Sequence, residues 1–305
     1  MRDGRIVAER YRSGEDWKWD LSLGVVDFGP ETLHDIRSVS KSVTSLLYGI
    51  ALGRDLVPAP DERLLPYFAK YADVATDPDK ERLTVWHALT MSLGIEWHED
   101  VPYTSTANSE IAMEFASNRY RYVLGQPVVE EPGQRWHYCG GATALLGKLI
   151  ADGTGQPLQD FARDALFAPL GISAFEWMVG ADGVASPASG LRLAPRSLAQ
   201  IGQLLLQHGR WDGQEMVPAA WLDEALRTQL VIEPGFDYGY QWYLGTIDEE
   251  AGPRAPVRWV GGIGNGGQRL FVLPDLATVI AIAGGSYDSA DQTSTAAAIL
   301  EAVLA

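Results

Sequence analysis

The sequence contains very little cysteine, lysine and positive charge. Cys139 is the only cysteine among the 305 residues, so no disulfide can form within the chain and the redox compartment cannot be inferred. The formal net charge at pH 7 is −16. Nucleic acids and anionic membrane surfaces are bound through basic surfaces, so this acidity argues against both as partners.

The chain also lacks long apolar runs. No stretch approaches the roughly 20 apolar residues that a membrane-spanning helix requires. The first residues, MRDGRIVAERYRSG, contain no apolar region of the kind found in a secretory signal. These absences predict a cytoplasmic protein without a membrane span. Because RIVAERY is predicted to be a strand starting close to Met1, the sequence leaves open whether another segment precedes it.

No metal-binding pattern is visible. The five histidines form neither an HExxH motif nor a closely spaced pair, and one cysteine cannot build a structural zinc site. We therefore expect no metal and no organic cofactor. The histidines are expected to be surface or packed side chains: His34, His87, His98, His137 and His208.

Strand-like segments lie at both ends of the chain, and helical patterns fill the middle. Apolar residues recur at helical spacing from Ser38 to Leu52, and Gly53 predicts the end of this helix. Further helices are predicted at 83–91, 108–116, 143–150, 158–166, 195–208, 218–226 and 290–304. Strands are predicted at 5–11, 20–26, 238–244, 257–261, 269–273 and 278–283.

This order predicts an α/β (α+β) fold in which both chain ends build an antiparallel sheet flanked by helices. Residues 1–55 and 185–305 are expected to form the sheet subdomain, and residues 56–184 a mostly helical inserted subdomain. The active site is expected in the cleft between them.

A glycine-rich stretch matches a dinucleotide-binding motif only superficially. Residues 262–267 read GIGNGG, which satisfies G-x-G-x-x-G, but that motif requires a helix to follow. Here QRLFVLPDL follows, which is a strand ending at a turn, so we reject the match. The glycines indicate either a tight hairpin or a cleft edge where main chain approaches a ligand closely.

Ser38 and Lys41 form the only S-x-x-K pair in the chain. Residues three apart share one face of a helix, so Lys41 is expected one turn after Ser38. A serine in a first helical turn can act as a nucleophile if a neighbouring lysine accepts its proton. The alternative is an N-capping serine beside a surface lysine. Spacing alone does not separate the two interpretations.

Several stretches, in order along nearly the whole chain, resemble the serine β-lactamase and penicillin-binding-protein superfamily. SVSKSVTSLLYGIAL is similar to its nucleophile helix, LTVWHALTMSLGIEW to the segment that follows, and EPGQRWHYCGGATALLGKLI to the stretch with its catalytic tyrosine. SGLRLAPRSLAQIGQLLLQHGRWDG and GIGNGGQRLFVLPDL resemble a later stretch and the active-site strand. The resemblance is to class C β-lactamase-like enzymes, near the esterase and 6-aminohexanoate-oligomer hydrolase branches.

The resemblance implies roles for individual residues. Ser38 would be the acylated nucleophile, Lys41 would take or relay its proton, and Tyr138 would act with Lys41 as base and then as acid. A tyrosine beside an ammonium can have a lowered pKa, which fits this role. The backbone N–H groups of Ser38 and Gln268 would form the oxyanion hole, with Gly267 preceding the second donor.

Two departures from the family pattern concern substrate recognition. The family's second motif ends in an asparagine that contacts a substrate amide, whereas this chain has Gly140. Its third motif usually contains a lysine or histidine that helps hold a substrate carboxylate, whereas this chain has Asn265. Both losses disfavour β-lactamase and carboxypeptidase activity. The sequence also offers no obvious glutamate for deacylation, so Tyr138 would have to activate the water.

The neighbours of these residues are expected to be mainly structural. Trp136 is interpreted as a wall and His137 as a packed side chain. Cys139 is not expected to act as a nucleophile, because a thiolate would need a partner and exposure. Tyr240 and Trp242 either line an acyl pocket or belong to the core, and Trp242 is kept as a candidate substrate contact.

The sequence and the resemblance together predict a serine hydrolase that forms an acyl-enzyme with a small ester or amide substrate. One alternative within the superfamily is a penicillin-binding or D-amino-peptide hydrolase, or a β-lactamase. An alternative of another class is a non-catalytic binding protein with the same fold. Substrate identity and oligomeric state cannot be read from the sequence.

Overall fold

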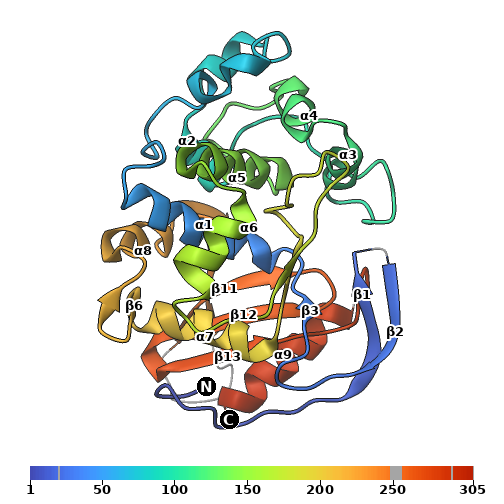
Figure 1. The fold of residues 1–305 in the computed structure, drawn as a ribbon, viewed down its shortest axis with the longest axis vertical. Helices are drawn as coiled ribbons and strands as arrows, with labels where there is room; N and C mark the ends of the chain where they lie inside the picture. The colour runs from blue at the N-terminus through green and yellow to red at the C-terminus, as the bar shows by residue number, and fades with distance from the viewer. Residues whose placement is uncertain (20, 248–255, 290, 305) are drawn as a thin grey trace.

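The computed structural model describes residues 1–19, 21–247, 256–289 and 291–304. An antiparallel sheet occupies one end of the molecule and a group of helices the other, with α1 between them (Figure 1). This mixed helix and antiparallel-sheet fold confirms the predicted fold class. Asp20 and Ala290, which begin the predicted strand 20–26 and helix 290–304, lie outside the described residues.

The main sheet has six strands in the order β13-β12-β11-β10-β9-β8. Because every neighbouring pair is consecutive in sequence and antiparallel, short connections suffice to build it. Gly266 and Gly267, with φ of 87° and 86°, supply the left-handed turn between β11 and β12. The strands are β8 (Leu230–Glu233), β9 (Phe236–Tyr238), β10 (Tyr243–Ile247), β11 (Val257–Gly264), β12 (Gln268–Leu273) and β13 (Thr278–Ile282).

Helices cover this sheet and connect it to the rest of the molecule. Helix α1 (Val39–Leu52) packs against β11 on one side and against α5 (Gly140–Thr154) on the other. Helix α7 (Pro195–Leu206) packs on β12 and β13, and α9 (Asp291–Leu304) lies beside the sheet (Figure 1). All residues of α1 from Val39 to Ala51 are buried, so this helix is part of the core.

The helical region is built around α5. Its other helices are α2 (Val85–Leu89), α3 (Ser109–Phe115), α4 (Arg119–Gly125) and α6 (Leu158–Ala162), with a π-helical turn (Arg163–Phe167) after α6. Two 3₁₀ helices, η1 (Leu65–Tyr71) and η2 (Pro78–Arg82), precede α2. A third, η4 (Pro274–Leu276), connects β12 to β13, and α8 (Ala219–Ala225) follows α7.

The N-terminal strands do not join the main sheet as predicted. The hairpin of β1 (Ser13–Lys18) and β2 (Leu21–Asp27) is separate, and β3 (His34–Asp35) pairs with β5 (Leu191–Leu193), which also pairs with β4 (Glu176–Trp177). Strands β6 (Arg210–Trp211) and β7 (Gln214–Glu215) form another small hairpin.

The N-terminal segment touches the main sheet at one bridge, between Arg2 and Thr278, next to a hydrogen bond from the Met1 amine to the Val279 carbonyl. The strand predicted at 5–11 is absent. Its apolar residues Ile6 and Val7 remain exposed and so bury no face against the sheet.

Candidate active site

A strained turn leads the chain into α1. Arg37, which directly precedes Ser38, has a φ of 48°, a conformation that costs about 1–3 kcal/mol in residues other than glycine. Asp35 accepts a hydrogen bond from the Arg37 backbone N–H at 3.0 Å and pairs with its guanidinium at 3.2 Å. Because such strain persists only where neighbouring contacts fix the backbone, these contacts hold Ser38 in place.

Ser38 occupies the N-cap position of α1, yet its side chain caps nothing. Its Oγ instead lies 3.1 Å from Lys41 Nζ. Lys41 is only 2% exposed, so it is not the surface lysine of the alternative interpretation. The backbone N–H of Ser38 also donates no hydrogen bond to any described residue. The local geometry therefore fits a nucleophile beside a lysine better than it fits a helix cap.

The other two hydroxyls of the SVSKSV stretch are structural. Ser40 Oγ donates to the Arg37 carbonyl at 2.6 Å and accepts from the Leu191 N–H at 3.2 Å. Ser42 Oγ donates to the Gln241 carbonyl at 2.8 Å. These bonds tie α1 to β5 and to the segment before β10, so both hydroxyls are committed to holding the helix in place.

Lys41 is a buried ammonium with three partners. Besides Ser38 Oγ, its Nζ lies 3.0 Å from the Ala188 carbonyl and 3.3 Å from Glu110 Oε2. Burial alone would lower the pKa of Lys41, but attraction to the Glu110 carboxylate raises this pKa above its usual value. The Lys41 side chain is consequently charged at neutral pH. Its pKa is not lowered, as it would have to be for the neutral amine to act as a base.

Tyr138 reaches the same point from the residues just before α5. Lys41 Nζ lies 4.8 Å from the centre of the tyrosine ring, and Tyr138 and Ser38 line the same cleft. Burial raises the pKa of Tyr138 to about 12, although Lys41 and Ser38 act in the opposite direction. The lowered tyrosine pKa expected from the neighbouring ammonium was therefore wrong, because burial outweighs the charge of Lys41.

Two glutamates that the sequence did not reveal adjoin Lys41. Glu110 stands in the first turn of α3, where the Asn108 side chain accepts its backbone N–H at 3.0 Å. Glu99 Oε2 accepts the backbone N–H of Gly140 at 2.5 Å, and Tyr103 donates to Glu99 Oε1 at 3.0 Å. The structure therefore shows two carboxyl groups near Lys41, while the expectation that the sequence offers no glutamate for deacylation stays a prediction.

These two carboxyl groups are coupled and carry different charges. Burial, followed by repulsion from Glu110, raises the pKa of Glu99 to about 8. Burial also opposes ionisation of Glu110, but attraction to Lys41 and a hydrogen bond from Glu99 lower the pKa of Glu110 below its usual value. At pH 7 the pair holds one proton, on Glu99.

A cleft of about 520 Å³ opens at Ser38. Of the predicted site residues, Ser38, Tyr138 and Asn265 line it, whereas Lys41 lies buried behind Ser38. Its other lining residues come from the loop before α3, from β10 to β12 and from the start of α9: Glu99, Asp100, Val101, Pro102, Tyr103, Tyr243, Ile263, Gly264, Arg269, Asp288, Ser289, Gln292 and Thr293.

The structure does not bring Gln268 and Gly267 to this cleft. Gln268 begins β12 as the partner of Gly264, is fully buried, and uses its side chain to bind the backbone of Gly284. Gly267 belongs to the hairpin turn. Asn265 does line the cleft, but its amide exchanges two hydrogen bonds with Asp288, at 2.7 and 2.9 Å.

Instead, β11 itself runs beside the start of α1. A Cβ on Gly262 would lie 2.9 Å from Val39 Cγ1, and one on Gly264 would lie 2.6 Å from the Ile36 carbonyl oxygen. The absence of side chains at Gly262 and Gly264 therefore lets the strand approach Ser38 closely. β10 pairs with β11 only up to Gly261, so Ile263 and Gly264 form an edge next to Ser38.

Trp242 and Gly140 are buried rather than cleft-lining. Trp242 is fully buried in the core, and the cleft is lined by the next residue, Tyr243. In a regular strand, Tyr240 and Trp242 would point to the same face. Gln241, between them, has a φ of 64°, which interrupts this alternation of side chains. Gly140 contacts the two glutamates at the start of α5.

The residues flanking Tyr138 are structural, as predicted. Trp136 packs against Tyr138 and Tyr243. A ring nitrogen of His137 bonds the Trp97 carbonyl at 2.8 Å. Cys139 is buried, and burial raises the pKa of its thiol above the usual value, which disfavours a thiolate.

Comparison with known proteins identifies the family. The sequence profile of the beta-lactamase family matches residues 1–304, nearly the whole chain. The chain belongs to the beta-lactamase family. It is accordingly a serine-type hydrolase, which confirms the predicted superfamily and enzyme class.

Relatives of this beta-lactamase-family enzyme include hydrolases with different substrates. It is 24% identical to a 6-aminohexanoate-dimer hydrolase of Paenarthrobacter ureafaciens over 302 residues, covering 92% of this chain and 70% of the relative. A putative 6-aminohexanoate-dimer hydrolase from Bacillus anthracis superposes with a TM-score of 0.77 at 15% identity, covering 96% and 78% of the two chains.

An octameric penicillin-binding protein homologue from Pyrococcus abyssi superposes with a TM-score of 0.69 at 18% identity. The alignment covers 96% of this chain and 73% of that one. At these identities the two solved structures establish the shared fold. The number of subunits belongs to the Pyrococcus protein and is not transferred to this enzyme.

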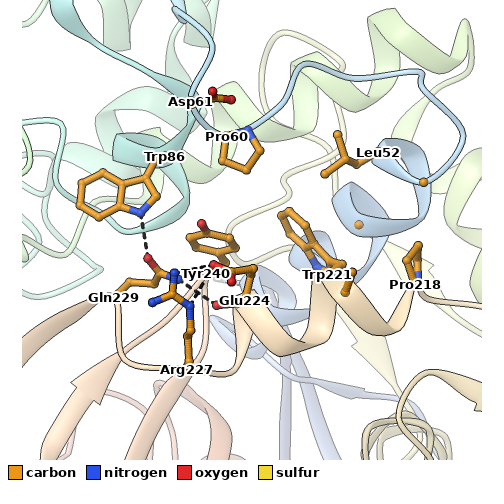
Figure 2. A pocket seen from close by; sticks show the side chains of 13 residues that line it. Leu52, Pro60, Asp61, Trp86, Pro218, Trp221, Glu224, Arg227, Gln229 and Tyr240 are labelled. Carbon is orange, nitrogen blue, oxygen red and sulfur yellow. Dashed lines mark hydrogen bonds and ion pairs between the residues drawn. The ribbon is translucent and has the colours of Figure 1, made fainter.

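The enzyme has a second cavity, of about 570 Å³, away from Ser38 (Figure 2). Trp86, Trp221 and Tyr240 form its aromatic walls, and the Trp86 indole N–H donates to Gln229 at 2.9 Å. None of the predicted catalytic residues lines it. Tyr240 therefore belongs to this cavity and not to an acyl pocket beside Ser38.

Within residues 1–19, 21–247, 256–289 and 291–304, no three histidine, cysteine or carboxylate side chains gather in a way that could hold a metal ion. No helix in the same ranges is long and apolar enough to cross a membrane.

Proposed function

We propose that this enzyme hydrolyses a small ester or amide through an acyl-enzyme formed on Ser38. The observation that carries the proposal is the 3.1 Å distance between Ser38 Oγ and Lys41 Nζ at the cleft, with the Tyr138 ring 4.8 Å from the same Nζ. A nucleophile, a proton-transferring partner and a group able to protonate a leaving group thus meet at one point.

Backbone N–H groups support the charge that develops during attack. The N–H of Ser38, which donates to no described residue, lies at the N-cap of α1, where the helix dipole favours negative charge. We place the second donor on the cleft-lining edge of β11, at Ile263 or Gly264, in place of Gln268. Removing one such donor typically costs about 10²–10³ in kcat.

The proposed reaction runs in two halves. Ser38 Oγ attacks the substrate carbonyl, its proton passes to the lysine side, and Tyr138 gives a proton to the departing alcohol or amine. Water then attacks the acyl-enzyme, with its proton leaving through the same groups. The lack of an asparagine at Gly140 argues for an ester or an unusual amide over a β-lactam.

A direct assay tests this function. Wild-type enzyme should turn over p-nitrophenyl acetate, and Ser38→Ala should lower kcat/KM by at least a hundredfold. Ser42→Ala is the matched control, because it removes a hydroxyl from the same helix that is committed to the Gln241 carbonyl. Unchanged turnover in Ser38→Ala would remove the proposed mechanism.

One observation favours a second candidate, a hydrolase of carboxylate-bearing substrates such as a penicillin-binding or D-amino-peptide hydrolase. Arg269 lines the cleft and donates to two backbone carbonyls, those of Gly264 and Gln268, but it pairs with no carboxylate among the described residues. Its guanidinium supplies a positive charge that Asn265 lacks. Covalent labelling by a fluorescent penicillin would support this candidate, and the absence of a labelled band would remove it.

A further inference from the structure

Glu110, which is buried, and Glu99, which is half-buried, connect Lys41 to the cleft. Glu110 Oε2 lies 3.3 Å from Lys41 Nζ, and both side chains are 2% exposed. Glu99 is hydrogen-bonded to Glu110 and lines the cleft beside Ser38. Carboxyl groups are rarely buried together, because two negative charges cannot share a site of low polarity unless one is protonated.

Gly140 makes room for this arrangement. A Cβ at this position would lie 2.4 Å from Glu110 Oε2, so any larger residue would displace the carboxylate. The backbone N–H of Gly140 meanwhile donates to Glu99 Oε2 at 2.5 Å. The glutamate pair thus occupies the space next to Lys41 that a side chain after Tyr138-Cys139 would otherwise fill.

A charged Lys41 has no capacity to accept the Ser38 proton unless it releases one of its own. Within the part of the chain that the structure describes, its Nζ is hydrogen-bonded to three groups: Ser38 Oγ, the Ala188 carbonyl and Glu110 Oε2. A backbone carbonyl is not a practical base, and Ser38 is the proton donor. Of these three hydrogen-bonded groups, Glu110 is therefore the one that can receive the lysine proton during attack.

We propose that Glu110 and Glu99 form the proton-accepting end of a relay that begins at Ser38 and passes through Lys41. This inference rests on the proposed function, because it requires Ser38 to be the nucleophile. Both glutamates are positioning residues that act through Lys41, since neither contacts the reacting oxygen.

The proton balance of the relay closes within the site. As Ser38 Oγ forms its bond to the acyl carbon, the Oγ proton moves to Lys41 Nζ, and one Nζ proton moves to Glu110 Oε2. When the tetrahedral intermediate collapses, Tyr138 protonates the leaving oxygen or nitrogen. Lys41 then returns a proton to Tyr138 and recovers one from Glu110, so no external donor is needed.

Glu99 sets how readily the pair accepts that proton. While Glu99 is protonated, its hydrogen bond stabilises the Glu110 anion and makes it a weak base. Once Glu99 ionises, the pair binds one proton with a pKa of about 8, close to the value that suits a base at neutral or mildly alkaline pH. The relay should therefore become faster as pH rises through this range.

Other titratable groups face the pair from each neighbouring element. They are Lys41 from α1, Tyr103 from the loop before α3, Glu114 one turn further along α3, Tyr138 and Cys139 before α5, and Tyr238 and Tyr243 from β9 and β10. Burial raises the pKa of the tyrosines and of Cys139. Burial also raises the pKa of Glu114 to about 7, so Glu114 is the group whose titration must be distinguished from that of Glu99.

The test is the pH profile of kcat/KM for p-nitrophenyl acetate between pH 5.5 and 9.5, measured on the full chain. Glu110→Gln and Glu99→Gln probe the relay. Glu114→Gln is the matched control, because Glu114 is equally buried but bonds Ser186 and Arg119 instead of Lys41. We expect the wild-type and Glu114→Gln profiles to rise with a midpoint near pH 8.

We expect Glu99→Gln to lose this rise and Glu110→Gln to lower kcat/KM by about a hundredfold or more, the usual range for general acid–base groups. If both variants keep the wild-type profile while Ser38→Ala is inactive, the relay is wrong and the proposed function survives. If Ser38→Ala is active, the proposed function itself fails.

A second variant covers the case in which a glutamine variant does not fold. Gly140→Ala keeps every charge but pushes a methyl group against Glu110 Oε2. It should lower kcat/KM at least tenfold while a fluorophosphonate still labels Ser38. A folded Gly140→Ala with the wild-type rate would overturn the relay.

Discussion

The Lys41 ammonium and the Glu110 carboxylate lie 3.3 Å apart with only 2% of each side chain exposed. Both charges of such a buried ion pair lose their hydration, and the cost of this loss can exceed their mutual attraction. The surrounding structure therefore keeps the pair in place. Breaking it by removing one partner leaves an uncompensated buried charge. Activity and stability at this position are therefore coupled, and matched controls are needed to separate them.

Replacing Lys41 should lower both the activity and the stability of the enzyme. Lys41→Met removes the group next to Ser38 Oγ and should lower kcat/KM by about 10²–10⁴. It also leaves Glu110 without its cation, which typically costs about 3–5 kcal/mol unless the carboxyl becomes protonated. Lys80→Met is the control: Lys80 is a buried lysine that donates to the Leu124 carbonyl, away from the cleft. Equal losses of kcat/KM in both variants would show that Lys41 acts only through stability.

Removing the hydroxyl of Tyr138 should affect the chemistry far more than the fold. Tyr138→Phe keeps the ring that packs on Trp136 and lies near Lys41 Nζ. We expect kcat to fall by about 10²–10³ with the melting temperature nearly unchanged, since only the proton donor is lost. Tyr240→Phe, in the second cavity, should retain wild-type kcat. A Tyr138→Phe enzyme with wild-type kcat would exclude the tyrosine from proton transfer.

A substitution at Gly264 tests whether the edge of β11 supplies the second oxyanion donor. Gly264→Ala places a methyl group 2.6 Å from the Ile36 carbonyl oxygen, so β11 must move away from the start of α1. We expect kcat to fall by about 10²-fold, as when one oxyanion donor is lost, with a smaller change in KM. Gly14→Ala on β1 meets nothing within 4 Å and is the control. Steady-state kinetics that match for the two variants would remove β11 as the second donor.

Glu99 makes stability depend on pH in a definite direction. Its pKa rises from 4.5 to about 8 in the folded chain, so the folded state binds this proton more tightly than the unfolded state does. Its contribution is complete below about pH 4.5 and is lost as pH rises through about 8.

Melting temperatures of wild type and Glu99→Gln should therefore be compared at pH 5 and at pH 8.5. The wild-type value should fall relative to that of the variant at the higher pH. A difference between the two proteins that stays constant across this range would show that Glu99 does not titrate in it.

The predictions that succeeded from sequence rest on local signals. The helix beginning at Ser38, its end at Gly53 and the strands predicted at 257–261, 269–273 and 278–283 follow from spacing and turn residues. The strand predicted at 238–244 was wrong, because residues 239–242 lie between β9 and β10. The proximity of Ser38 and Lys41 follows from one helical turn. Tyr138 was found only through the resemblance, because a hundred residues separate it from Ser38 and no local pattern connects them.

The predictions that failed depend on tertiary contacts. Glu99 and Glu110 carry no local sign of burial, and only the absence of a side chain at Gly140 hinted at a space to be filled. The left-handed φ of Gln241 shifts the register of the following strand, so Tyr243 and not Trp242 reaches the cleft. The direction expected for the Tyr138 pKa reversed because it depends on burial, which the sequence does not show.

Intact-protein mass spectrometry after exposure to a panel of esters, amides, β-lactams and a fluorophosphonate shows whether Ser38 is the nucleophile. We expect a single acyl or phosphonyl adduct on the wild type, mapped by proteolysis to the peptide that contains Ser38. Ser38→Ala, compared with Ser42→Ala, should lose the adduct. An adduct that persists in Ser38→Ala, or no adduct from any reagent on the wild type, would contradict the account.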